Sequence, residues 1–285
     1  MSRDLLSGQR WVRYLTWRAM RIVARDLPPG GALLLARGVA EVLWFLDAPG
    51  RRTVTANLAP LIPDRTARQR AVRRCYRACA EQLALTLRLD RRPLRNPATI
   101  PLHDPWQVFA TTPLSGPVII AASHVDWDVV LTVLHAQRLI TDLAVVALPS
   151  GDPWIDRELC ALRATAGAQT LPWAKAARVS LQHLRDGGCL GVLADRDYSL
   201  GSSVTVTTAG CRRQLTTGPA DLARRSGALL IPVAVVHGTV LVGGAYQPRT
   251  RNEVVAATRA IADFHLRAIA AAPGRWVAFH RIWAG

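Results

Sequence analysis

The sequence has few cysteines, few acidic residues and no uninterrupted long apolar run, and each shortage excludes a class of protein. The five cysteines are scattered and odd in number, which excludes a disulfide framework and favours a reducing compartment. Cys75 and Cys79 lie one helical turn apart, but no neighbouring histidine or cysteine completes a ligand set, so we predict no metal site. With 285 residues, half of them hydrophobic, the chain is long enough for one large globular domain or two modest ones.

The shortage of acidic residues makes the chain strongly basic. Asp and Glu number 20 against 36 Lys and Arg, so the formal net charge is +16, and Lys175 is the single lysine. Such a charge favours polyanions or anionic membrane surfaces, and arginine suits bidentate binding of phosphate. A solvated basic surface without a specific ligand is the alternative. No nucleic-acid-binding module is recognisable, so nucleic acid is not an expected partner.

No segment matches a membrane-spanning helix, which needs roughly 18 to 20 apolar residues. The nearest candidate, residues 227–246, contains Pro232 and a His-Gly pair among β-branched residues, so it predicts two buried strands joined by a turn. Charged residues interrupt the first ten positions, which excludes a secretory signal. We therefore expect peripheral membrane contact on the cytoplasmic side.

The first third of the chain has a helical pattern. Residues 9–23 predict a basic amphipathic helix with aromatic residues, which can either lie in a lipid headgroup layer or pack against the rest of the protein. The pattern continues with three proline-containing breaks, at residues 28–31, 48–50 and 62–64, before a proline-rich connector begins at residue 92. We expect a membrane-facing helical section over residues 1–92 and an α/β body over residues 93–285.

The body alternates short apolar runs with helical stretches. Continuous apolar runs indicate strands that are buried on both faces, and their alternation with helices predicts an α/β fold. The runs are residues 117–122, 143–148, 189–194 and 229–236, and the helical stretches are residues 128–137, 154–166, 175–185, 219–226 and 253–271. Residues 204–207 and 239–242 add strands, so we expect a mixed, mainly parallel sheet with helices on both faces, preceded by the helical N-terminal section.

Polar residues follow two of the predicted strands, where open α/β sheets gather ligands. The first strand runs into residues 123–128, Ser-His-Val-Asp-Trp-Asp, and the third into residues 195–197, Asp-Arg-Asp. His124 is suited to general-base catalysis, with Asp128 one helical turn later to hold one ring nitrogen. Alternatively, Ser123 or Asp126 caps a helix and His124 fills a polar corner. No phosphate-binding loop, dinucleotide fingerprint or serine nucleophile elbow follows any strand.

Three ordered stretches resemble the lysophospholipid acyltransferase superfamily, and within it the branch of lipid A late acyltransferases and phosphatidylinositol mannoside acyltransferases. The stretches are SHVDWD, LADRDYS at residues 193–199 and GPADLARRSGALLIPV at residues 218–233, and the C-terminal RWVAFHRIW is similar more loosely. With the helical front section, the resemblance covers residues 10–283.

The resemblance implies roles for residues at both strand ends. His124 becomes the general base and Asp128 the acid of the motif, while Asp195 or Asp197 orients His124, with Asp197 preferred. Arg196, Arg212 and Arg213 become candidates for holding a phosphate of the lipid, of coenzyme A or of a carrier-protein phosphopantetheine, the alternative being a network of charges at the strand end. The catalytic set is therefore His124, Asp128 and Asp197, and the substrate-binding set is Ser123, Asp126, Asp195, Arg196, Arg212 and Arg213.

Two departures from the family pattern bear on these roles. Three residues separate His124 from Asp128 where the family has four. Either the carboxylate is re-aimed or the local helix starts earlier and compensates, and Asp126 is left as a competing partner. The branch usually has an aromatic pair before a glycine after the Asp-Arg-Asp strand, where this chain has Thr208-Ala209-Gly210. A different acyl chain or acceptor is the expected consequence.

The function implied by the resemblance is O-acyl transfer at the cytoplasmic face of the cell membrane. A fatty acyl group would move from acyl-CoA or acyl carrier protein, as co-substrate, to a hydroxyl of a glycolipid or phospholipid, with no bound cofactor or metal. Two alternatives stay open. One is an acyltransferase of specialised metabolism that acts on a soluble sugar or peptide alcohol, and the other is a catalytically inactive basic relative that binds membranes.

Overall fold

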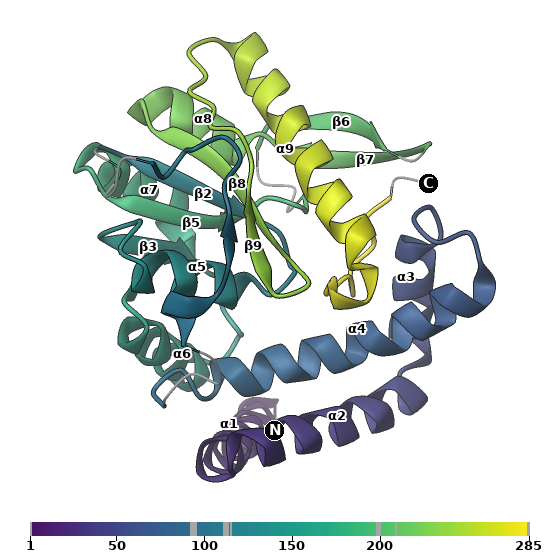
Figure 1. Cartoon of the computed structure of the whole chain (residues 1–285). Coiled ribbons are helices and arrows are strands. Elements are labelled where there is room, and N and C mark those ends of the chain that lie inside the picture. The colour runs from purple at the N-terminus through teal and green to yellow at the C-terminus, as the bar shows by residue number, and fades with distance from the viewer. Residues whose placement is uncertain are drawn as a thin grey trace.

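The computed structural model describes residues 2–91, 96–110, 114, 116–197, 201–208 and 210–283, with side chains from Trp11 onward apart from those of Asp128 and Thr208. The chain begins with the helices α1 (Ser2–Asp26), α2 (Pro29–Leu46), α3 (Ala48–Leu58) and α4 (Arg65–Thr86). Each predicted break separates two of them: Pro28 precedes α2, while Asp47 and Asp64 cap α3 and α4 by accepting hydrogen bonds from backbone N–H groups. Helix α4 lies between α2 and the rest of the molecule (Figure 1).

Helix α2 overturns the expectation that no segment could span a membrane. Among the described helices, it is long and apolar enough to cross a bilayer, and only 17% of it is buried. Its two charged residues, Arg37 and Glu41, both form ion pairs with residues of α4, so charge is confined to the side that faces α4. The other side exposes large apolar side chains, namely Leu34, Leu35, Val39, Val42, Leu43, Phe45 and Leu46.

Helix α1 combines the two alternatives that the sequence left open. Trp17 is buried, and its indole N–H donates to Glu158 at 3.0 Å, so one side packs against α6 (Pro153–Thr165). Trp11, Leu15 and other apolar residues on the remaining surface are exposed. One side therefore packs and the other stays available for a lipid surface.

The body contains a seven-stranded sheet in the order β1-β9-β8-β2-β5-β3-β4. Strands β8 and β9 pair antiparallel and the other neighbours pair parallel, which confirms the predicted mixed, mainly parallel sheet. Residues 227–246 form β8, β9 and the turn between them, as predicted. The strands are β1 (Leu102–His103), β2 (Val118–Ala122), β3 (Leu143–Val146), β4 (Ala168–Leu171), β5 (Cys189–Leu193), β8 (Leu229–Val236) and β9 (Thr239–Val242).

The predicted strand at residues 204–207 does not join this sheet. It lies in β6 (Ser203–Thr208), which pairs antiparallel with β7 (Cys211–Thr216) in a separate two-stranded sheet. Val204, Val206 and Leu215 bury one side of this hairpin against α9 (Arg251–Ala271), while polar residues alternate with them. Such alternation is typical of a strand buried on one face, whereas the central strands have continuous apolar runs.

Helices cover both faces of the large sheet, as expected. Ile120 packs in a cluster with α5 (Trp127–Ala136), while its neighbour Ile119 packs on the opposite face. That opposite cluster includes residues of α7 (Ala176–Arg185), α8 (Gly218–Ser226) and α9. Short 3-10 helices η1 (Pro97–Thr99), η2 (Trp173–Lys175) and η3 (Pro273–Arg275) complete the element order.

A third core cluster joins the N-terminal helices to the C-terminal end of the chain. Val54 of α3 and Cys75 of α4 pack with Ile269 of α9 and with Trp276, which follows η3. The backbone N–H of Val277 donates to the carbonyl of His124 at 3.0 Å, so the segment after η3 runs beside the end of β2. This cluster crosses residue 92, and the division of the chain there stays a prediction.

Candidate active site

His124 and Asp195 meet at the carboxyl ends of β2 and β5. These strands pair in parallel with Ala122 opposite Leu193, so continuing the register by two residues brings His124 beside Asp195. His124 Nδ1 lies 2.6 Å from Asp195 Oδ1, and the backbone N–H of His124 donates to Oδ2 at 3.1 Å. One carboxylate therefore fixes both the ring and the backbone of His124.

Asp195 is fully buried, and its second oxygen has a further partner. The indole N–H of Trp276, itself fully buried, donates to Asp195 Oδ2 at 2.9 Å. Burial by itself would raise the pKa of Asp195, but the charge and hydrogen bond of His124, with Arg196 and His265 nearby, hold that pKa well below its usual range. Asp195 is therefore an anion that can only accept hydrogen bonds.

This pairing determines the proton arrangement of the imidazole. Because the carboxylate only accepts, Nδ1 carries the proton that lies between His124 and Asp195, and the lone pair is on Nε2. A histidine held in this way can take a proton through Nε2, and the carboxylate stabilises the imidazolium that forms.

The geometry favours Asp195 over Asp197, the preferred residue in the sequence analysis, as the carboxylate that orients His124. Asp195 occupies Nδ1 because it is in register with His124, whereas Asp197 lies two residues beyond that register. In the structure both His124 and Asp195 come two residues after the end of their strands, whereas the predicted apolar runs end at residues 122 and 194, so the sequence alone does not pair these two residues. Asp128 lies in the first turn of α5, and its side chain falls outside the described part.

Asp126, the competing partner in the sequence, forms an ion pair elsewhere. It has a positive φ of 46° at the start of α5, and its Oδ2 accepts from Arg275 Nε at 3.0 Å while Oδ1 pairs with Arg275 Nη2. Arg275 also binds Glu81 of α4 at 2.6 Å, and Glu81 binds Arg37 of α2 at 2.6 Å. Charged groups therefore connect the turn after His124 to the N-terminal helices.

The three arginines suggested for phosphate binding differ in their surroundings. Arg213 is fully buried and donates to the carbonyls of Asp195 at 3.4 Å and Ala262 at 3.2 Å, so a role in holding a substrate phosphate does not fit it. Its neighbour Arg212 points to the other side of β7 and is exposed. Arg196 is buried, yet its Nε and Nη2 lack a hydrogen-bond partner within the part that the structure describes. Of the three, Arg196 best fits an anionic ligand.

A cavity of about 860 Å³ opens at His124. Most of its lining is apolar, from Trp127 and Leu131 of α5 to the ends of β3 and β5 and the start of α8. Three basic side chains also line the cavity, namely Arg163, Lys175 and Arg178. Ser123, predicted to bind substrate, is buried beside His124 and does not line the cavity, and its hydroxyl has no partner among the described residues. The cavity can hold a long apolar group next to an anionic one.

Two residues that hold the site were not among the predicted ones. Trp276 and Arg275 come from the C-terminal end of the chain, about 150 residues after His124. The Trp-rich C-terminal stretch resembles the family only loosely, and no spacing rule connects it to His124. In the described residues, no group of three or more His, Cys, Asp and Glu could hold a metal ion.

Comparison with known proteins agrees with the family resemblance of these motifs. No curated protein sequence matches the chain. The family model described as bacterial lipid A biosynthesis acyltransferase matches residues 1–284. This match spans nearly the whole chain, including the N-terminal helices, the His124 turn and the Trp-rich end. The chain therefore belongs to the bacterial lipid A biosynthesis acyltransferase family, whose members transfer acyl groups to lipid acceptors.

Proposed function

We propose that the protein is an O-acyltransferase that moves a fatty acyl group from a thioester donor to a hydroxyl of a glycolipid or phospholipid. The observation that carries the proposal is the buried pair of His124 and Asp195, with His124 on the wall of a largely apolar cavity. A base beside an apolar cavity of about 860 Å³ suits a reaction between a hydroxyl and a long acyl chain.

The proposed reaction is a direct transfer. His124 Nε2 takes the proton of the acceptor hydroxyl while that oxygen attacks the thioester carbonyl, and the charge of the imidazolium is stabilised by Asp195. The tetrahedral oxyanion then collapses, the carbon–sulfur bond breaks, and the imidazolium returns the proton to the leaving thiolate. Arg196 follows Asp195 in sequence and does not line the cavity, but its two donor nitrogens that are unpaired in the described structure make it our candidate for binding an anionic group beside the strand end.

Both donors under consideration combine an apolar chain with a phosphate, in coenzyme A or in the phosphopantetheine of an acyl carrier protein. We assign the apolar part of the cavity to the acyl chain. Lys175 and Arg178 are exposed at the cavity and, with Arg163, are suited to bind the donor phosphates. The donor is a co-substrate, and no resident cofactor or metal enters the proposed reaction.

We further propose that the protein is peripheral and lies on the cytoplasmic face of the cell membrane. If α2 crossed the bilayer, the arginines of α4 that pair with Glu41 would enter the hydrocarbon region, which is costly. If α2 lies flat, its apolar side contacts the acyl chains and α4 stays on the polar, headgroup side of α2. A phosphatidylinositol mannoside or a similar glycolipid is a suitable acceptor for such an enzyme.

The test is thioester turnover by purified full-length protein, followed as release of free thiol from long-chain acyl-CoA and from acyl carrier protein donors. We expect His124→Ala to lower turnover by about a hundredfold or more, the range for loss of a general base. Retention of full turnover by His124→Ala would overturn the mechanism.

Acceptors are then compared at equal concentration, as lipid in vesicles and as soluble sugars or peptide alcohols. Acylation of the vesicle lipid is the expected result. Exclusive acylation of a soluble alcohol would contradict the membrane acceptor while leaving the chemistry intact. Vesicle binding without turnover on either donor would favour a catalytically inactive relative.

A further inference from the structure

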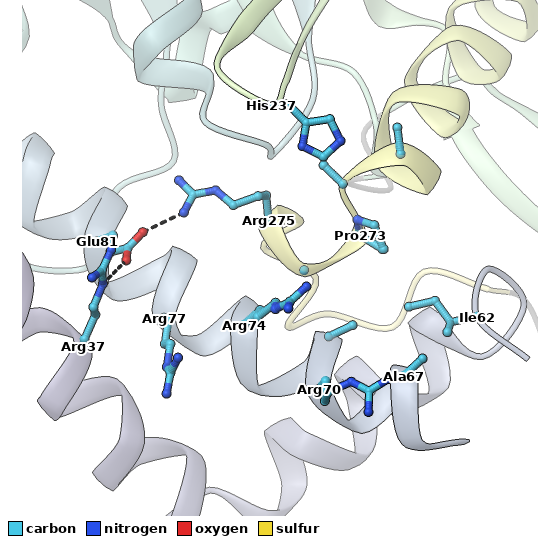
Figure 2. A pocket seen from close by; sticks show the side chains of 14 residues that line it. Arg37, Ile62, Ala67, Arg70, Arg74, Arg77, Glu81, His237, Pro273 and Arg275 are labelled. Atoms are coloured by element: carbon cyan, nitrogen blue, oxygen red, sulfur yellow. Dashed lines mark hydrogen bonds and ion pairs between the residues drawn. The ribbon is translucent and has the colours of Figure 1, made fainter. Parts of the chain in front are cut away.

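A second pocket, of about 820 Å³, lies between α4, η3 and the turn that joins β8 to β9. Figure 2 shows Arg70, Arg74 and Arg77 along α4, with Arg275 and Arg37 reaching Glu81 from two sides. Neither His124 nor Asp195 lines this space. We call it the α4 basic pocket, and its lining consists of Arg37, Ile62, Ala67, Arg70, Ala71, Arg74, Arg77, Glu81, His237, Ala271, Ala272, Pro273, Gly274 and Arg275.

The lining has five arginines and a single carboxylate, which is a formal excess of four positive charges. Glu81 is already shared by Arg37 and Arg275, and Arg77 pairs with Glu41 outside the pocket. Arg70 and Arg74 have no ion pair or hydrogen bond in the part of the chain that the structure describes, and both are exposed. These two guanidinium groups therefore keep all their donors for a ligand.

Arg70 and Arg74 are four residues apart on one side of α4. Like charges at this spacing destabilise a helix, and among the described residues no carboxylate pairs with either arginine to offset the repulsion. The pocket between them and η3 is lined by small residues, including Ala71 and Gly274. A side chain at Gly274 would meet the stem of Arg74, with its Cβ 2.8 Å from the Arg74 Cβ, so the absence of a side chain lets η3 lie against α4. Because these lining residues are small, they leave the guanidinium groups of Arg70 and Arg74 accessible to an anion.

The position of the pocket indicates which anions it meets. Arg37 belongs to α2, whose opposite side exposes apolar residues such as Leu34 and Phe45. A helix with this surface favours the boundary between lipid headgroups and acyl chains, and α4 packs directly against it (Figure 1). The α4 basic pocket then lies at the level of the lipid phosphates.

We propose that the α4 basic pocket binds the phosphate of a membrane lipid headgroup, through Arg70 and Arg74. Two guanidinium groups on one helix side suit a phosphate monoester, which presents several acceptor oxygens. The inference is independent of acyl transfer, because the pocket shares no residue with the cavity at His124.

The experiment measures binding of the full-length protein to phosphatidylcholine vesicles that contain phosphatidic acid. The test variant is Arg70→Gln/Arg74→Gln. The matched control is Arg52→Gln/Arg65→Gln, which removes two exposed arginines of the same helical section that lie outside the pocket and have no ion pair among the described residues. We expect the test variant to bind at least about tenfold more weakly than wild type, since each basic residue near an anionic surface contributes close to a factor of five. We expect the control to lose less than threefold.

Three outcomes would overturn the proposal. An equal loss in both variants would mean that binding is spread over the basic surface, and no loss in the test variant would mean that the pocket is not used. The third outcome concerns a soluble phosphate compound. Pyrophosphate would raise the melting temperature of wild type but not of the test variant, and vesicles with and without phosphatidic acid would bind equally. This result would assign the pocket to a free phosphate compound.

Two further measurements separate this proposal from the proposed function. His124→Ala should bind the vesicles as wild type does, whatever its turnover. Arg70→Gln/Arg74→Gln should keep wild-type thioester turnover in detergent and a wild-type circular dichroism spectrum. A pocket variant that lost turnover in detergent as well would contradict a separate lipid site.

Discussion

The turn after His124 and the α4 basic pocket use charged residues in opposite ways. In the His124 turn, residues 123–128, the charged side chains that the structure describes are buried or part-buried and paired: Asp195 holds the imidazole and Asp126 pairs with Arg275. In the α4 basic pocket, Arg70 and Arg74 are exposed and have no partner within the described residues. Ion pairs and hydrogen bonds fix the position of the imidazole, which proton transfer requires. An unpaired guanidinium group in a pocket instead keeps its N–H donors available for a ligand.

Arg275 belongs to both regions. It forms ion pairs with Asp126 of the His124 turn and with Glu81, which lines the α4 basic pocket. Burial by itself would lower the pKa of Arg275, but its hydrogen bonds and attraction to Asp126 and Glu81 raise it well above the usual value. The ion pairs therefore hold η3 between α4 and the end of β2, and the predictions below test each side of the comparison.

The largest effect is expected from the carboxylate that holds His124. Asp195→Asn should lower kcat by about a thousandfold, because an amide presents an N–H and favours the wrong imidazole tautomer. Asp197→Asn, two residues further on, is the matched control and should keep most of the activity. Thioester turnover measures both variants, and a larger loss in Asp197→Asn would reverse the assignment of the two carboxylates.

The next largest effect concerns the exposed side of α2, where apolar residues have no partner in the described structure. Leu34→Gln/Phe45→Gln should weaken binding to neutral phosphatidylcholine vesicles by about a hundredfold, since each apolar side chain that leaves lipid costs about 1.5 to 3 kcal/mol. Trp106→Gln removes an exposed aromatic residue from outside the helical section and should bind as wild type does. Equal binding by all three proteins would remove α2 from the membrane contact.

A smaller effect is expected when the second support of Asp195 is removed. Trp276→Phe keeps an aromatic ring but deletes the N–H that donates to Asp195 Oδ2. We expect about a tenfold lower kcat with little change in KM, and about 1 to 3 kcal/mol less stability, because a buried carboxylate loses a hydrogen bond. The NMR chemical shift of the proton between His124 Nδ1 and Asp195 should also change, and an unchanged shift with lower kcat would mean that Trp276 does not act through Asp195.

The smallest effect is a pH dependence of stability from Glu81. Burial by itself would raise the pKa of Glu81, but its hydrogen bonds and ion pairs with Arg37 and Arg275 lower it below its ordinary 4.5. A carboxylate with a lowered pKa in the folded state contributes stability above its unfolded pKa and loses that contribution as the pH falls through the folded value. Since both arginines are more than a third exposed, the contribution is about 1 kcal/mol.

Glu81→Gln removes this contribution without changing the size of the side chain. The variant should be less stable than wild type at pH 7, and the difference should shrink as the pH is lowered below 4.5. Urea denaturation at a series of pH values measures it. A constant difference between the two proteins over the whole range would mean that the ion pairs of Glu81 do not stabilise the fold.

The sequence by itself determined most of the elements and the histidine of the candidate site. Continuous apolar runs predicted β2, β3, β5 and β8, since a strand covered on both faces must be apolar at every position. Proline-containing breaks separated the N-terminal helices, and the motif that follows β2 identified His124. The weaker signals were missed: β4 has only four residues, two of them polar, and the two charges of α2 concealed that this predicted helix is long and apolar enough to cross a bilayer.

Only the tertiary structure decided which groups act together. Asp195 rather than Asp197 holds His124 because parallel pairing places β2 and β5 side by side in one register, and a linear sequence contains no register. Trp276 and Arg275 reach the site from the other end of the chain, and Arg213 faces inward while Arg212 faces out on the same strand. Local composition predicts elements, but contacts across about 70 to 150 residues follow from how those elements pack.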